Sequence, residues 1–192
     1  MSHWFGSKSR SDLRRWLDKE GEEALTKIGI RKGQTVLDFG CGSGNYTVPV
    51  AGIVGEEGRV YALDRNERAL DELMQRAESE GLRNISRMDT SGGSETGLDD
   101  KSVDVVLLYD VFWYFPLTGH RLSELLAEVY RVSKVDALIS VYPQHVDSER
   151  LKRKIETAGF LLKDRHFGTF LHYDKLESGE VLNFIKKAGT KG

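Results

Sequence analysis

The sequence predicts an α/β protein built on a doubly wound, mostly parallel sheet. Short β-branched runs alternate with longer segments of helical periodicity along most of the chain, which is typical of such sheets. Two of the runs, 103–108 and 137–141, are almost continuously apolar, as strands covered by helices on both faces require. A length of 192 residues suits one such domain.

The expected elements follow one another in a regular order. After a ten-residue arm, a helical pattern runs from Ser11 to Ile28, and Gly29 ends it. The later patterns predict strands at 35–39, 59–63, 85–88, 103–108 and 137–141, and helices from about 45 and at 66–80, 119–133 and 147–158. Two final apolar runs leave no room between them for a crossover helix. We therefore expect strands 160–166 and 181–186 to pair antiparallel at one sheet edge, around a turn at 177–180.

Composition excludes several classes of protein. A formal net charge of −2 with 30% charged residues gives no bulk attraction for nucleic acid. No apolar stretch approaches the ~20 residues of a membrane helix, and the N-terminus lacks the apolar region of a signal peptide. The lone Cys41 excludes an intramolecular disulfide and indicates a reducing compartment. We therefore expect a cytoplasmic protein.

A glycine loop is the most informative segment. Gly40, Gly42 and Gly44 come directly after an apolar strand and before a helix. Glycine lets a ligand approach where any Cβ would collide, and the helix N-terminus offers free N–H groups. A tight strand-to-helix turn also needs glycines for structural reasons alone, so the loop by itself leaves both interpretations open.

An acidic residue after the second strand sharpens this interpretation. Asp64 follows the run 60–63, at the spacing where a carboxylate receives a ribose diol in nucleotide-binding folds. The third glycine of the dinucleotide motif would fall at Asn45, which disfavours a nicotinamide cofactor. Asp38 would repel a pyrophosphate but would suit an ammonium group. These residues point to a nucleoside that carries an amino-acid zwitterion.

At these residues the chain resembles the class I S-adenosylmethionine-dependent methyltransferases. Four motifs in order carry the resemblance, together with the terminal Ala158-Gly159-Phe160: the segments 36–44, 60–64, 84–89 and 102–110. It extends from about Lys32 to Ile185. The resemblance implies a Rossmann-like seven-stranded sheet in the order 3-2-1-4-5-7-6 with strand 7 antiparallel. It assigns residues 31–192 to the cofactor-binding domain and leaves residues 1–30 as an arm and helix, a candidate lid.

The resemblance also implies a role for individual residues. S-adenosylmethionine would be the cofactor, with S-adenosylhomocysteine as the product. Asp64 would hold the ribose hydroxyls, Arg65 would lie beside the adenine, and Asp89 would accept the adenine amino group. The cofactor-binding residues expected in this way are Asp38, Phe39, Gly40, Cys41, Gly42, Gly44, Asp64, Arg65, Met88, Asp89, Thr90 and Tyr109.

The acceptor is less constrained. Within the family the chain is similar to the methyltransferase type 11 and ubiquinone–menaquinone methyltransferase groups, whereas its single cysteine argues against arsenite methylation. We expect in-line transfer to an unidentified small molecule. Tyr109 and Asp110 are the candidate catalytic residues, although a packing ring and a strand-end cap explain them equally well. Methylation of RNA or protein, and a non-catalytic cofactor-binding scaffold, stay open.

Other residues have weaker interpretations. The aromatic run 109–115 either lines an acceptor pocket or packs the following helix. His3-Trp4-Phe5 and Trp16 are candidates for the lid. The five histidines lack the spacing of metal ligands, so we expect no metal. The expected partner is a small-molecule acceptor, without membrane or nucleic acid, bound by a monomer or homodimer.

Overall fold

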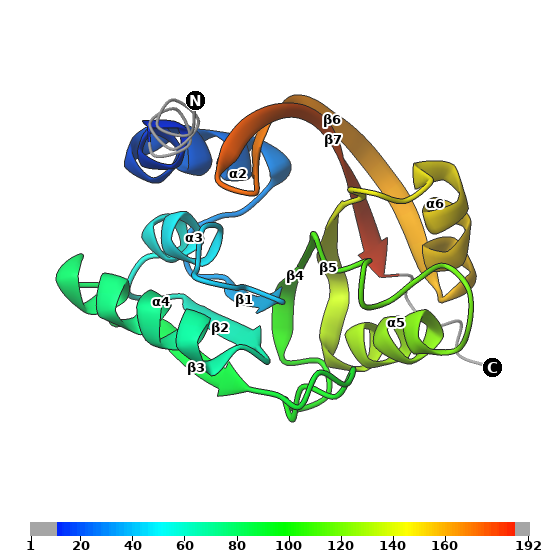
Figure 1. Ribbon diagram of the computed structural model, residues 1–192. Coiled ribbons are helices and arrows are strands. Elements are labelled where there is room, and N and C mark those ends of the chain that lie inside the picture. Colours follow the sequence, from blue (N-terminus) through cyan, green and yellow to red (C-terminus); the bar gives the residue numbers. More distant parts are fainter. Residues whose placement is uncertain (1–10, 187–192) are drawn as a thin grey trace.

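The computed structural model describes residues 11–186 as a seven-stranded sheet in the order β3-β2-β1-β4-β5-β7-β6 (Figure 1). Strands β1 to β5 pair parallel with one another, and β7 is antiparallel to both β5 and β6. The expected strand order and the antiparallel strand 7 are therefore confirmed. In chain order the elements are η1 (Trp16–Glu20), α2 (Gly21–Ile28), β1 (Thr35–Phe39), α3 (Thr47–Val54), β2 (Arg59–Asp64), α4 (Glu67–Ser79), β3 (Ile85–Asp89), β4 (Val103–Tyr109), α5 (Arg121–Val132), β5 (Ser133–Tyr142), α6 (Ser148–Thr157), β6 (Phe160–His172) and β7 (Lys175–Lys186).

Each face of the sheet carries its own hydrophobic core. One core joins the sheet to the N-terminal helix, α3 and α4, and includes Leu25, Val50 and Leu73. The other joins the opposite face to α5 and α6, and includes Leu125 and Ile155. The apolar runs of β4 and β5 alternate between the two cores, which explains why these strands lack a polar face.

The position of the C-terminal turn corrects the sequence prediction. The two strands meet at Tyr173 and Asp174, not at 177–180, so β6 and β7 are both longer than expected. Tyr173 and Asp174 have φ of 45° and 58°, the left-handed geometry that a two-residue hairpin turn requires. Neither is glycine, so the usual signal for such a turn is absent from the sequence. Gly179 instead lies within β7, opposite Gly168 of β6.

This long hairpin brings β6 and β7 past the sheet towards the N-terminal helix (Figure 1). The helix runs from residue 11 to Ile28 with a π-helical turn at its centre. Trp16 in that turn is fully buried, and its Nε1 donates to the Asn45 carbonyl at 2.8 Å. The candidate lid residues His3, Trp4 and Phe5 lie outside the described residues.

Candidate active site at the carboxyl ends of the strands

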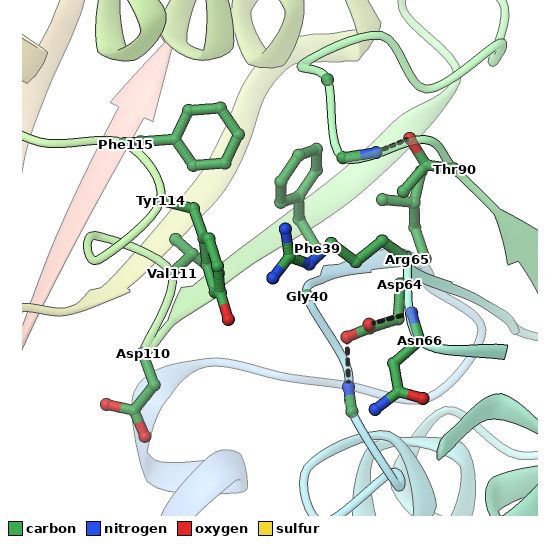
Figure 2. A pocket seen from close by; sticks show the side chains of 14 residues that line it. Phe39, Gly40, Asp64, Arg65, Asn66, Thr90, Asp110, Val111, Tyr114 and Phe115 are labelled. Atoms are coloured by element: carbon green, nitrogen blue, oxygen red, sulfur yellow. Dashed lines mark hydrogen bonds between the residues drawn. The ribbon is translucent and has the colours of Figure 1, made fainter. Parts of the chain in front are cut away.

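A cavity of about 280 Å³ opens where β1, β2 and β4 end (Figure 2). The strand order reverses between β1 and β4, and ligands of doubly wound folds bind at such a switch point. Its lining residues are Phe39, Gly40, Gly42, Leu63, Asp64, Arg65, Asn66, Thr90, Gly92, Gly93, Asp110, Val111, Tyr114 and Phe115.

Three glycines form the loop after β1, and two of them, Gly40 and Gly42, line the cavity. All three have positive φ, 80° at Gly40, 54° at Gly42 and 83° at Gly44, which favours glycine. A Cβ on Gly40 would lie 2.7 Å from Val111, and one on Gly44 would collide with Leu73. A Cβ on Gly42 would meet nothing within 4 Å. Gly42 therefore keeps space open for a ligand, whereas its two neighbours allow the chain to pack.

Asp64 is held rigidly beside the glycine loop. Its Oδ2 accepts the Gly42 N–H at 2.8 Å and its Oδ1 accepts the Asn66 N–H at 2.8 Å (Figure 2). These two bonds fix the carboxylate at the cavity wall. Each oxygen keeps acceptor capacity, so the carboxylate can still receive hydroxyl groups of a ligand.

Arg65 and Tyr114 face each other inside the cavity (Figure 2). The guanidinium carbon lies 4.2 Å from the centroid of the Tyr114 ring, within the range of a cation–π contact. Thr90, on the neighbouring strand end, accepts the Gly92 N–H at 3.3 Å. Together these side chains provide flat and polar surfaces next to Asp64.

Asp38 lies behind the glycine loop, outside the cavity lining. It is buried, and its Oδ2 accepts the Thr47 hydroxyl at 2.6 Å. Burial, opposed by the Thr47 hydrogen bond and reinforced by the Asp64 charge, raises the pKa of Asp38 to about 7. Cys41 is also buried, and burial raises the pKa of its thiol far above the ordinary value. This disfavours a reactive thiolate.

Other expected site residues lie away from the described lining of the cavity. The Asp89 carboxylate is exposed, and its Oδ1 accepts a hydrogen bond from Arg87 Nη2 at 2.8 Å. Hydrogen bonding to Arg87 lowers the pKa of Asp89. Met88 is half-buried on the α5 side of the sheet. Tyr109 is buried, and its hydroxyl shares a hydrogen bond with Ser140 at 2.7 Å. In this conformation Thr90 lies closer to the cavity than its neighbour Asp89.

Asp110 does line the cavity, and it contacts a residue that the sequence did not reveal. Its φ is 56°, and its Oδ2 lies 2.9 Å from His172 Nδ1. His172 stands 62 positions away at the end of β6, and no motif links the two. The sequence likewise did not individually assign the lining residues Leu63, Asn66, Gly92, Gly93, Val111, Tyr114 and Phe115. The aromatic run 109–115 was the signal for the last two.

The comparisons place the chain in a family. Residues 36–136 match the family described as "Methyltransferase domain", which is more than half of the chain, so the chain belongs to this family. The expected family is thereby confirmed.

Individual relatives cover less of the chain. It is 30% identical over 107 residues to the demethylmenaquinone methyltransferase of Geobacillus stearothermophilus, spanning 56% of this chain and 45% of that one. It is 46% identical over 61 residues to a probable cobalt-precorrin-6B C(15)-methyltransferase (decarboxylating) of Saccharolobus solfataricus, 32% of this chain and 31% of that one. The chain thus spans less than half the length of these relatives.

Solved structures share the fold along nearly the whole chain. A SAM-dependent methyltransferase from Aquifex aeolicus has a TM-score of 0.68 at 22% identity, covering 92% of this chain and 98% of that one. The magnesium protoporphyrin IX methyltransferase of Synechocystis with bound SAM has a TM-score of 0.68 at 16% identity, covering 97% and 86%.

Two further findings concern residues 11–186 only. No helix among them is long and apolar enough to cross a membrane. No group of three or more His, Cys, Asp or Glu side chains among them is arranged to hold a metal ion.

Proposed function

We propose that the protein transfers a methyl group from S-adenosylmethionine to a small-molecule acceptor. The observation that carries the proposal is the pairing of a fixed Asp64 carboxylate with the open space above Gly42, at the switch point of the sheet. Packing fills the Gly40 and Gly44 positions but leaves the Gly42 position open, so a ligand has room to approach the backbone there. The observed site therefore fits the cofactor that the sequence predicts.

Named residues of the chain would hold the cofactor. Asp64 would accept the ribose hydroxyls, while Arg65 and Thr90 would border the adenine. The Gly40–Gly44 backbone, with Asp38 behind it, would face the amino-acid end. We keep Phe39, which lines the cavity, in the proposed set. We propose only a supporting role for four expected residues, because their side chains do not line the cavity in this conformation: Cys41, Met88, Asp89 and Tyr109.

When bound, the cofactor supplies a methyl group activated by a positively charged sulfur. The protein then has to align an acceptor behind that methyl and keep water out. Tyr114 and Phe115, which line the cavity, provide an apolar wall for this purpose. Tyr109 has no proton-accepting role in our proposal. Burial raises the pKa of its hydroxyl, so the hydroxyl keeps its proton, and this hydroxyl is hydrogen-bonded to Ser140.

The names of several relatives support a small acceptor, because they refer to small molecules, namely demethylmenaquinone, cobalt-precorrin-6B and aklanonic acid. A cytoplasmic location and a monomeric or homodimeric state stay predictions.

Calorimetric titration with S-adenosylmethionine, S-adenosylhomocysteine and NAD tests the proposal. We expect both sulfur nucleosides to bind and NAD not to bind. Asp64→Ala should weaken their binding roughly 10- to 100-fold, since hydrogen bonds to a charged group contribute about 1.5–3 kcal/mol. Asp99→Ala, at an exposed position outside the cavity lining, is the matched control. Absence of sulfur-nucleoside binding, or binding of NAD instead, would contradict the proposal.

A further inference from the structure

Two imidazoles meet beside the wall of the cavity at which Asp110 lies. His145 belongs to the loop between β5 and α6, and His172 is the last residue of β6. Their Nε2 atoms lie 2.9 Å apart, although 27 positions separate the two residues along the chain. No spacing motif in the sequence could therefore reveal this pair.

The Asp110 carboxylate orients the buried His172. Asp110 Oδ2 lies 2.9 Å from His172 Nδ1. Because an ionised carboxylate only accepts hydrogen bonds, His172 Nδ1 carries the proton and Nε2 presents a lone pair towards His145. A carboxylate behind the ring is typical of metal-binding histidines, since it fixes the tautomer and orientation of the imidazole and makes it more basic.

The backbone around His172 adopts uncommon conformations that bring His145 to it. Six non-glycine residues between 11 and 186 have a positive φ, and three of them adjoin His172: Asp110 at 56°, His145 at 62° and Tyr173 at 45°. The His145 ring packs against Trp113, with 4.7 Å between the ring centroids. Left-handed residues gathered at one place are more typical of functional sites than of ordinary packing.

The separation of the two nitrogens matches that of neighbouring ligands on a metal ion. Nitrogens about 2.0–2.1 Å from a metal lie about 2.9 Å apart at a right angle and about 3.3–3.4 Å apart at the tetrahedral angle. Right angles belong to square-planar, tetragonal and octahedral sites, and nitrogen ligands in such geometry favour Ni²⁺ or Cu²⁺. A proton shared by the two nitrogens gives the same separation, and a metal ion would replace that proton.

The two imidazoles make an open site. Among residues 11–186, no further His, Cys, Asp or Glu joins them to form a group of three, so water would complete the coordination. His145 is exposed, whereas His172 is buried. An ion could thus reach the pair from solvent, and it would exchange more readily than an ion in a closed site of four protein ligands.

We propose that His145 and His172 bind a divalent late transition-metal ion of the Ni²⁺ and Cu²⁺ class. The ion would join the loop between β5 and α6 to the end of β6, and so brace the wall of the cavity at Asp110. Neither imidazole lines the cavity. The ion therefore takes no part in methyl transfer, and the proposal does not depend on the proposed function.

Calorimetric titration with NiCl₂ tests this proposal. His3 lies outside the described residues, so every sample carries His3→Gln to remove any Ni²⁺ that His3 binds. We expect one Ni²⁺ per chain with a Kd on the order of 10–100 μM, weaker than closed sites with more ligands. MgCl₂ should not bind there, because Mg²⁺ requires oxygen ligands. Ni²⁺ should also raise the midpoint of thermal unfolding, since the unfolded chain does not hold the two imidazoles together.

Three variants locate the ion. His145→Gln removes one of the two ligands at an exposed position, and it should weaken Ni²⁺ binding about tenfold or more. His120→Gln is the matched control, because the His120 side chain is 82% exposed at the start of α5; it should leave binding unchanged. Asp110→Asn removes the charge behind His172 and should weaken binding about tenfold, the lower end of such effects. Asparagine tolerates the left-handed backbone at that position.

The outcomes are decisive in both directions. Absence of Ni²⁺ binding up to about 1 mM, or binding that is unchanged in His145→Gln, overturns the proposal. An equal loss in His120→Gln also overturns it, because the ion would then bind scattered surface histidines. Thermal unfolding without metal shows whether each variant is folded. The nucleoside titration tests the proposed function separately, so a failure of Ni²⁺ binding leaves that function standing.

Discussion

The buried Asp38 makes the stability of the folded protein depend on pH. Its carboxyl has an ordinary pKa of 3.8 and a folded-state pKa of about 7. Below pH 3.8 both states hold the proton. Between 3.8 and about 7 the unfolded chain has lost it while the folded protein retains it, so unfolding releases a proton and stability falls as the pH rises. Above about pH 7 both states have lost the proton, so Asp38 causes no further fall in stability.

Asp38→Asn should remove this pH dependence. The amide oxygen can still accept the Thr47 hydroxyl, but the side chain no longer ionises. The variant should therefore gain stability relative to the wild type as the pH rises from 4 to 7, by at most roughly 4 kcal/mol for a pKa difference of about three units. Urea unfolding of both proteins, without ligand, at a series of pH values measures the difference. Parallel stability curves would show that Asp38 titrates normally.

At the residue level the sequence predicted the parts of the site that are local. Asp64 is the last residue of β2, and Gly42 lies just after β1, the neighbouring strand. Their hydrogen bond could therefore be expected from the positions of the two strand ends. The resemblance assigned Asp89 to the adenine amino group, and that role stays a prediction. In this conformation its carboxylate is bound by Arg87, and an ion pair between two nearby side chains leaves no periodic signal in the sequence. The contact of Asp110 with His172 joins elements that the sequence alone cannot bring together.

The hairpin of β6 and β7 shows how one element constrains another. Gly168 and Gly179 pair across it, and neither has a positive φ. A Cβ on Gly179 would lie 2.6 Å from the Tyr142 ring, whereas one on Gly168 would lie 3.5 Å from Phe170. Tyr142 of β5 therefore requires a glycine at one member of the pair only.

This asymmetry predicts opposite outcomes for two matched variants. Gly179→Val should lower the free energy of unfolding by about 1–3 kcal/mol, since it overpacks a site beneath the buried Tyr142 ring. Gly168→Val should change it by no more than about 0.5 kcal/mol or stabilise the protein, since β-branched residues suit strands. Thermal and urea unfolding compare them. Equal destabilisation would mean that the strands, and not Tyr142, require the glycines.

Among the elements, those with their own periodicity were predicted most accurately. The strand Thr35–Phe39 has the bounds that the sequence indicated, because it is buried on both faces and ends at a glycine. The strand β5 instead begins at Ser133, before its apolar run. The turn at Tyr173–Asp174 was missed because tertiary contacts, including the Asn45–Asp174 hydrogen bond at 2.9 Å, support a left-handed turn that lacks glycine.

For the whole molecule, Trp16 joins three regions that are distant in sequence. Its Nε1 donates to Asn45 at the end of the glycine loop. Its ring packs edge-on against Tyr46 at 5.2 Å and Phe170 at 6.5 Å between centroids. Tyr46 in turn donates to the Leu171 carbonyl at 2.7 Å. The N-terminal helix, the glycine loop and the hairpin therefore meet at one buried indole.

Trp16→Ala should consequently loosen the glycine loop as well as the helix. We expect a loss of about 3–5 kcal/mol in the free energy of unfolding, the usual cost of removing a buried tryptophan. Hydrogen exchange should accelerate in residues 41–47 and 170–176, and not only in 11–28, because the indole supports all three segments. Trp113→Ala, at an exposed ring, is the matched control and should change stability by no more than about 0.5 kcal/mol. Faster exchange confined to residues 11–28 would show that this helix is an independent arm, and that the glycine loop keeps its shape without it.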